Sequence, residues 1–237
     1  MSAEAARKLL IGDDGAGTSK LEYFDIEGVA EQVRIAFSVA DVPFEDVRIA
    51  WSDWGTKKPT TKYGQLPQLI LPDGTIVTQS EAMLRLAGAA DKQGKLYPDD
   101  AKSRLEIDQL LGLVGDFARA WRPCLYIGMR PQAFGHPEKK DWADADKTIE
   151  KLRTEFIKNE LPRYLEYFAE KHGKDKFLTG DDLTIADIAV YMQIRYFTRG
   201  IADYAPKDCV DKYPDSIAYL KRVEEHPKVA EYKKNKA

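Results

Sequence analysis

The pattern of apolar residues in the first third of the chain predicts a strand–helix–strand unit. Residues 20–24 alternate as a strand does, and residues 44–49 return as a second strand. Between them, residues 29–40 carry apolar side chains at helical spacing, from Val33 to Val39. A hairpin and a further helix follow, and this β-α-β-loop-β-β-α order fits the thioredoxin-like fold. We expect the first two strands to be parallel and the last two antiparallel.

The hairpin has a proline at its entrance. Gln68–Leu71 and Ile76–Thr78 are its expected strands, joined by a tight turn at Pro72-Asp73-Gly74. Proline is poorly tolerated inside a sheet, so Pro67 belongs at the start of the first strand, with Leu66 held extended. The Leu66–Pro67 bond is a candidate for the cis isomer, which turns the Leu66 N–H and C=O groups outward to pair with an extended peptide.

The segment after the hairpin begins an apolar helix over residues 82–90. Ser80 precedes this helix and is a residue type that is favoured at an N-cap. Free backbone N–H groups at the start of a helix bind carboxylates. A carboxylate site beside the peptide-pairing edge at Leu66 predicts a receptor for a small anionic peptide.

Strand patterns disappear after residue 100 and helical periodicity replaces them. Residues 101–129 predict one long helix, in which Pro123 favours a break because proline lacks the backbone donor. Residues 130–140 form a loop, and Pro162 should kink the next helical stretch, residues 143–171. The expected organisation is a flexible leader over residues 1–19, a thioredoxin-like domain over 20–90, a linker over 91–100 and an all-helical domain over 101–237, with its last helices at 213–225 and 229–234.

A capping box marks the start of another helix. Thr184 can accept from the amide three residues later, and Asp187 can reach back to the Thr184 amide. Leu183 and Ile188 occupy the positions of a hydrophobic staple. We expect Asp187 to be structural and to lie outside any functional site.

The composition describes an ordinary soluble globular protein. Hydrophobic residues make up 43% of the chain, charged residues make up 32%, and the net charge is −3. The scattered basic residues give no footprint for nucleic acid, and no apolar run approaches a membrane span. Cys124 and Cys209 form no C-x-x-C pair and no metal spacing, so we expect no metal site. A reducing cytosol is the simplest compartment.

Three short segments together resemble a known family. Residues 20–24, 64–67 and 79–80 resemble the glutathione-binding half of a cytosolic glutathione S-transferase. The pairs Tyr23-Phe24 and Asp53-Trp54 resemble the sigma class most closely, which includes glutathione-dependent prostaglandin D synthases and the S-crystallins. The resemblance covers roughly residues 20–234 and implies a dimer, in which the N-terminal domain of one subunit packs on the C-terminal domain of the other.

This resemblance implies a role for Tyr23. In the sigma, mu, pi and alpha classes, a tyrosine at this place donates its hydroxyl hydrogen bond to the glutathione sulfur. A free thiol has a pKa of about 8.5 and is mostly protonated at neutral pH. A donor that favours the thiolate lowers that pKa, and each unit corresponds to about 1.4 kcal/mol. The alternative for an isolated tyrosine is a half-buried aromatic residue of the strand.

The resemblance also implies the contacts to the rest of glutathione. The glycine end matches Trp54 and Lys58, with Gln65 nearby, and the γ-glutamyl carboxylate matches Gln79 and Ser80. The cysteinyl unit matches the backbone of Leu66, next to Pro67. Asp116 aligns with an acidic residue that reaches the γ-glutamyl amine in the partner subunit's site, and a solvated helix charge is the alternative for it.

The electrophile site should lie between the Tyr23 loop and the long helix. Apolar and aromatic side chains there suit hydrophobic electrophiles. An equally good interpretation of the residues on the long helix is that they pack in the core between helices. The expected lining is Ile26, Phe117, Trp121, Leu125 and Tyr126.

One position departs from the sigma pattern. Sigma enzymes usually carry arginine six residues after the tyrosine, and here that residue is Val29, which supplies no charge. Arg34 lies one to two helical turns further, and the sequence does not fix the direction of its side chain. Glu27 brings negative charge toward a thiolate. The departure weakens the case for vigorous catalysis more than the case for glutathione binding.

The leading hypothesis is a dimeric transferase that joins glutathione to hydrophobic electrophiles. Glutathione is the cosubstrate, and no bound cofactor is needed. A prostaglandin-type isomerase would use the same thiolate, and the sequence does not separate the two. A glutathione-binding but weakly active or structural protein, as in the S-crystallins, is the alternative from another class. A glutaredoxin-like oxidoreductase lacks its essential cysteine near the first helix.

Overall fold

The computed structural model describes residues 1–172 and 176–236 and builds its N-terminal part on a four-stranded sheet in the order β2-β1-β3-β4. β1 (Ser19–Phe24) runs parallel to β2 (Phe44–Ile49). On its other side β1 pairs antiparallel with β3 (Gln68–Ile70), which pairs antiparallel with β4 (Ile76–Thr78). The predicted strand order and directions of a thioredoxin-like fold are thus confirmed, and the Leu66–Pro67 bond is cis.

We define the sheet lobe as the four-stranded sheet together with α1 through α4. Two of these helices, α2 (Glu31–Val39) and α4 (Ser80–Ala89), form the core of the lobe with the sheet. α2 packs against α4, and both bury apolar side chains completely, such as Val33 and Met83. The connection from β2 to β3 is a series of short turns around α3 (Trp54–Lys57). The other turns are Gly28–Ala30 before α2, then Trp51–Asp53, Lys58–Thr60 and Lys62–Gly64.

The expected flexible leader is wrong for its first part, because Ala3–Ile11 form α1. Ala6 and Leu10, four residues apart, lie on one helical face and are fully buried against the lobe. The Arg7 guanidinium donates to the carbonyl oxygens of Ala40 and Ala90, at 3.0 and 3.1 Å. The spacing of Ala6 and Leu10 was present in the sequence, but the polar residues around them hid it.

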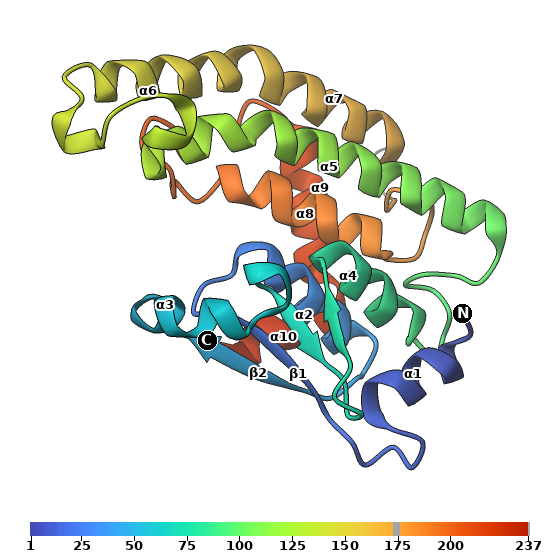
Figure 1. The fold of residues 1–237 in the computed structure, drawn as a ribbon. Coiled ribbons are helices and arrows are strands. Elements are labelled where there is room, and N and C mark those ends of the chain that lie inside the picture. The colour runs from blue at the N-terminus through green and yellow to red at the C-terminus, as the bar shows by residue number, and fades with distance from the viewer. Residues whose placement is uncertain (173–175, 237) are drawn as a thin grey trace.

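The remaining chain forms a helical lobe, which we define as α5 through α9, and a last helix that returns to the sheet lobe. Figure 1 shows the helices of this lobe layered above the sheet and α10 beside α2. Within the described residues, no helix is both long and apolar enough to cross a membrane. The helices are α5 (Ala101–Met129), α6 (Ala145–Glu155), α7 (Leu161–His172), α8 (Ile185–Phe197), α9 (Pro214–Glu225) and α10 (Pro227–Lys236).

The two prolines inside helical segments behave differently. α5 continues through Pro123 without the break that the sequence favoured. Before Pro162, in contrast, the chain widens into a π-helical turn, Phe156–Glu160, that separates α6 from α7. A proline cannot donate to the preceding turn and crowds its carbonyl, and a wider turn relieves both problems. The loop expected after α5 contains only short turns, at Pro131–Phe134 and Lys139–Asp141.

The capping box of α8 is present as predicted. The Asp187 carboxylate is fully buried and accepts from the Thr184 N–H at 2.8 Å and from the Leu178 N–H at 2.8 Å. The Tyr219 hydroxyl donates to the same carboxylate at 2.9 Å. Burial raises the pKa of Asp187, and these donors counter that shift. Asp187 therefore joins α8 to its neighbours.

Candidate functional site

The sheet register gathers the expected glutathione contacts at one edge. β1 and β3 pair Glu22 with Gln68, so the end of β1 at Tyr23 and the residues just before β3 lie at the same edge. β3 and β4 pair Gln68 with Thr78, so Gln79, which follows β4, lies at this edge too. The C-terminal end of parallel β2 reaches this edge too, and α3 follows it. Tyr23, α3, the hairpin entrance and the start of α4 thus share one end of the sheet.

The Tyr23 hydroxyl lies inside the loop that follows β1. Its ring is only 9% exposed, and a Cβ atom on Gly28 would come within 2.5 Å of the hydroxyl oxygen. Burial raises the pKa of Tyr23, while a hydrogen bond from the Val29 backbone N–H and the charge of Arg34 lower it. The raised pKa keeps the hydroxyl protonated at neutral pH, so it can act as a donor.

Arg34 supplies positive charge near Tyr23. Its side chain is fully buried, and its Cζ atom lies 5.9 Å from the centroid of the Tyr23 ring. The guanidinium donates to an Asp46 carboxylate oxygen at 2.9 Å, which fixes its direction. Val29, the position without the family's arginine, is instead 47% exposed and turns its side chain outward. Arg34 thus places a guanidinium against the Tyr23 ring, and its ion pairs with Glu31 and Asp46 offset much of its charge.

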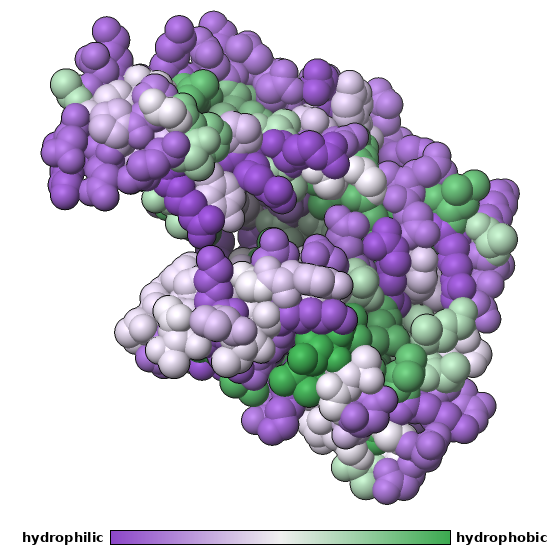
Figure 2. All heavy atoms as spheres, in the orientation of Figure 1, coloured by the Kyte–Doolittle hydropathy of each residue, from purple (hydrophilic) through white to green (hydrophobic). Residues whose placement is uncertain are grey.

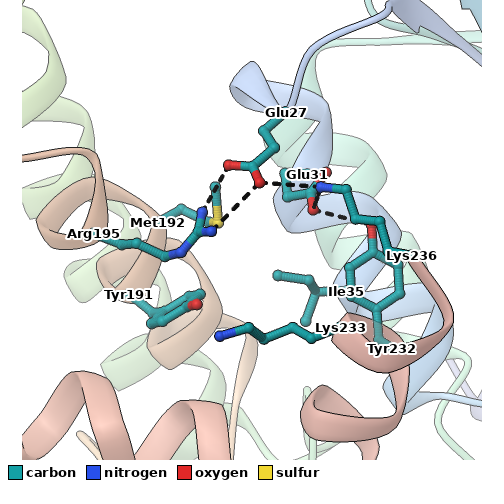
Figure 3. Close-up of a pocket in the computed structure, with 9 residues that line it drawn as sticks. All are labelled: Glu27, Glu31, Ile35, Tyr191, Met192, Arg195, Tyr232, Lys233 and Lys236. Atoms are coloured by element: carbon teal, nitrogen blue, oxygen red, sulfur yellow. Dashed lines mark hydrogen bonds and ion pairs between the residues drawn. The ribbon is translucent and has the colours of Figure 1, made fainter. Parts of the chain in front are cut away.

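The Glu27 carboxylate does not face the Tyr23 hydroxyl as a free negative charge. It accepts from the Arg195 guanidinium at 2.7 Å and pairs with Lys236 (Figure 3). It also pairs with Arg199. These partners overcome the effect of burial and lower the pKa of Glu27 to about 2. The repulsion expected from Glu27 is thus compensated.

The residues expected at the glycine end of glutathione lie on the turns after β2. Trp54 begins α3, is half-buried and meets the Phe24 ring edge-on with 5.2 Å between centroids. Lys58 and Gln65 are exposed, and the lysine stem passes beside Gly64. Gln65 has an extended backbone that leads into the half-buried Leu66.

The start of α4 differs from the expectation in one respect. Ser80 is the first residue of the helix, and the cap position belongs to Gln79, which has a positive φ of 69°. The N–H groups of Ala82 and Met83 donate to the Gln79 carbonyl oxygen. The Ser80 and Glu81 N–H groups precede the helix's own bonding pattern, and such groups at a helix start can bind a carboxylate.

The expected electrophile lining divides into two groups. Phe117 and Trp121 are 0% and 5% exposed and belong to the core of the helical lobe. Phe117 stacks on Tyr164 at 4.7 Å, and Trp121 packs on Phe156 at 5.0 Å. Both lie on the face of α5 that turns toward the other helices, as the alternative of packing core required.

The other three expected lining residues keep accessible surface. Ile26 is 42% exposed on the loop after β1, and Leu125 and Tyr126 are half-buried on α5. Tyr126 is close enough to Tyr23 to raise its pKa. Figure 2 shows the surface hollowed between the two lobes, with hydrophilic residues along the upper rim. Of the five expected lining residues, Ile26, Leu125 and Tyr126 are the ones with appreciable accessible surface.

Asp116 lies on the part of α5 that passes near the start of α4, because a Cβ on the preceding Gly115 would lie 3.8 Å from the Glu81 carboxylate. It is exposed on α5 and pairs with Arg119 at 2.6 Å. Its expected contact with glutathione requires a second subunit and stays a prediction.

Comparisons with known proteins give one consistent result. A profile of the glutathione S-transferase C-terminal domain matches residues 139–236. The structure of prostaglandin synthase D of Nilaparvata lugens is similar, with a TM-score of 0.74 and 28% identity over 93% of this chain and 98% of that one. Glutathione S-transferase 1 of Ascaris suum is 30% identical over 213 residues, covering 90% of this chain and 94% of that protein. This chain belongs to the glutathione S-transferase family.

A further relative of this glutathione S-transferase carries a different name. The hematopoietic prostaglandin D synthase of Gallus gallus is 29% identical over 213 residues, covering 89% of this chain and 92% of that protein. The predicted fold, with a small mixed sheet domain followed by helices, is thereby confirmed together with the family.

Sequence reasoning missed a buried network beneath the site of this transferase. Glu22 is 7% exposed on β1 and accepts from the Lys57 ammonium at 2.8 Å and from the Gln68 amide at 2.6 Å. The network fastens α3, which carries Trp54, to the middle of the sheet. The available signal was a glutamate between Leu21 and Tyr23 in the predicted strand. Within the described ranges, no group of three or more His, Cys, Asp or Glu residues could hold a metal ion.

Proposed function

We propose that this glutathione S-transferase activates glutathione with the Tyr23 hydroxyl and joins it to hydrophobic electrophiles. The Tyr23 oxygen already accepts from the Val29 N–H, and its raised pKa keeps its own hydrogen in place. That hydrogen is free to be donated to a sulfur atom. A thiolate that receives this bond is stabilised relative to the thiol, which is the condition for attack at neutral pH.

The rest of glutathione extends along the edge of the sheet. The backbone of Leu66 pairs with the cysteinyl unit, with cis Pro67 setting its direction. Trp54 and Lys58, with Gln65, hold the glycine carboxylate through N–H donors. Gln79 and Ser80 hold the γ-glutamyl carboxylate at the start of α4, and Asp116 of the second subunit meets the γ-glutamyl amine.

The reaction needs no group besides the two substrates. The thiolate sulfur forms a bond to an electrophilic carbon, and the leaving group departs with the bonding electrons. The proton lost from the thiol passes to solvent before the attack. Ile26, Leu125 and Tyr126 supply the accessible surface on which a small hydrophobic electrophile rests.

The test is conjugation of a chromogenic aryl halide by the wild-type protein and by Tyr23→Phe. Loss of the hydroxyl should lower the rate by about 100-fold or more, the contribution typical of a positioned proton donor. Tyr167→Phe is the matched control, because Tyr167 lies on α7 and is 41% exposed; its rate should equal wild type. An undiminished rate for Tyr23→Phe would contradict the proposal.

A prostaglandin-type isomerisation is the second candidate, and the names of the two similar proteins from Nilaparvata lugens and Gallus gallus favour it. The same thiolate would open an endoperoxide instead of displacing a leaving group. Product analysis with a prostaglandin endoperoxide separates the candidates. Glutathione affinity without turnover on either substrate class would instead favour a structural protein such as an S-crystallin.

The biological setting belongs to the same proposal. Sigma-class membership rests on the Tyr23-Phe24 and Asp53-Trp54 pairs. A homodimer is the assembly in which Asp116 can serve a neighbouring site. We place the protein in the cytosol and assign it a role in detoxification, with sedimentation and cell fractionation as the direct checks.

A further inference from the structure

The loop that carries Ile26, Glu27 and Gly28 has one carboxylate, that of Glu27, which contacts three cations from distant parts of the chain. Glu27 accepts from Arg195 of α8 at 2.7 Å and from Lys236 of α10 at 3.1 Å, and it pairs with Arg199 just after α8. Figure 3 shows the Glu27 carboxylate between Arg195 on one side and Lys236 on the other. The three cations come from segments about 170 to 210 residues further along the chain.

The surroundings make these ion pairs stronger than ordinary surface pairs. The side chains of Glu27 and Arg195 are 20% and 19% exposed, so solvent screens them only in part. They border a cavity of about 250 Å³ between α2, α8 and α10. The Arg195 partner is the leading cause that lowers the pKa of Glu27 to about 2, against the opposing effect of burial, and Lys236 adds to it. Glu27 is therefore ionised throughout the neutral range.

The backbone of the same loop determines the surroundings of the Tyr23 hydroxyl. Gly28 lies against the hydroxyl oxygen, and the Val29 N–H donates to it. On the inner side, Arg34 donates to the carbonyl oxygens of Ile26 and Glu27 at 3.1 and 3.3 Å. The loop is thus held by the buried Arg34 through its backbone carbonyls, and by the ion pairs of the Glu27 side chain with α8, Arg199 and α10.

We propose that Glu27 is a positioning residue for Tyr23. Its ion pairs with the helical lobe and α10 keep the loop at the distance where the Val29 N–H binds the Tyr23 oxygen, which aims the hydroxyl hydrogen at the sulfur of glutathione. This inference rests on the proposed function. Glu27 touches neither substrate, and it acts through the backbone of the two residues that follow it.

The sign of the effect separates positioning from a simple charge effect. Removing only a negative charge would leave three cations less compensated, which favours a thiolate and lowers the pKa of the bound thiol. Loosening the loop instead weakens the Val29 bond and makes Tyr23 a poorer donor, which raises the pKa of the bound thiol. Positioning therefore predicts an upward shift.

The experiment compares Glu27→Gln with Asp25→Asn. Asp25 belongs to the same loop, but its side chain is 78% exposed and its one ion pair among the described residues is with Arg48, at 3.6 Å, so Asp25→Asn should match wild type. For Glu27→Gln we expect kcat/KM for an aryl halide to fall about tenfold and its pH midpoint to rise by about one unit. The glutathione dissociation constant should stay within about twofold, because the carboxylate-binding residues are at the other end of the site.

A second variant decides the question if Glu27→Gln does not fold. Arg199 is 39% exposed, and Arg199→Ala removes only one of the three partners, so a smaller upward shift is expected. Where both variants fold, the double variant should shift the midpoint no further than Glu27→Gln alone, because the two changes break one shared contact.

Two results would overturn the inference. One is an unchanged or lowered pH midpoint in folded Glu27→Gln, or in Arg199→Ala if that variant alone folds. The other is a fall in thermal stability with kcat and pH profile intact, which describes a purely structural residue. Failure of the proposed function is distinct, because wild type itself would then show no glutathione-dependent turnover.

Discussion

The hydrogen-bonding state of the Tyr23 hydroxyl depends on neighbouring groups whose positions cannot be derived from the sequence. The loss of arginine at Val29 argued against strong activation. The Val29 N–H nevertheless reaches the Tyr23 oxygen, since a backbone donor does not depend on the residue type. The direction of Arg34 could not be derived from spacing alone, because it follows from where α2 begins and from the Asp46 carboxylate across the loop.

The contact between Gly28 and Tyr23 yields a prediction at this scale. Gly28 has a φ of +45°, and an added Cβ would come within 2.5 Å of the Tyr23 oxygen. Gly28→Ala should therefore displace the hydroxyl and lower kcat/KM for the aryl halide by about 100-fold, the cost of a misplacement of about 1 Å.

The control for this change is Gly74→Ala. Gly74 also has a positive φ, +85°, but nothing lies within 4 Å of the position of its Cβ. Its alanine variant should lose about 1 kcal/mol of stability and keep its turnover. Equal activity of the two variants, measured at saturating glutathione, would show that the contact with Tyr23 has no catalytic consequence.

At the scale of elements, local patterns predicted β2, β4 and α5 with the bounds that the structure has. Alternation and helical spacing indicate which face of an element is buried. Burial of one face is what determines whether these segments form a strand or a helix. α1 was not predicted because Ala6 and Leu10 are its two buried residues. Polar residues surround them, and a glycine-rich segment follows the helix. Short elements carry too few periods for the pattern to stand out.

Two neighbouring leucines of α1 test whether this helix is part of the folded domain. Leu10 is fully buried and Leu9 is 43% exposed. Leu10→Ala should lower the free energy of unfolding by about 2–5 kcal/mol, the range for a buried leucine, whereas Leu9→Ala should change it by less than about 1 kcal/mol. Urea denaturation measures both, and equal midpoints would restore the idea of a flexible leader.

At the scale of the whole molecule, contacts between distant segments decide what the sequence left open. Phe117 and Trp121 have the residue types of an electrophile pocket, but the packing of α5 on the other helices buries them. Only the tertiary arrangement brings Glu27 to Arg195 and to the end of α10. The sheet edge, in contrast, was predictable, because consecutive strands and turns assemble it.

The ion pairs between the lobes give stability a pH dependence. The pKa of Glu27 is lowered to about 2 in the folded protein, against about 4.3 for an unperturbed glutamate. The stabilisation is therefore complete above about pH 4.3 and is lost as the pH falls toward 2. The difference in urea midpoint between wild type and Glu27→Gln should be largest at neutral pH. It should become smaller as the pH is lowered to about 3. A difference that stays constant would mean that the carboxylate's charge does not stabilise the fold.

The most direct measurement of the central claim is the pH titration of thiolate absorbance for glutathione bound to wild type and to Tyr23→Phe. If the Tyr23 hydroxyl stabilises the thiolate, the midpoint in wild type should lie about two units below the value of about 8.5 for a free thiol. In Tyr23→Phe it should return close to that value, with glutathione still bound. The same lowered midpoint in both proteins would contradict the account.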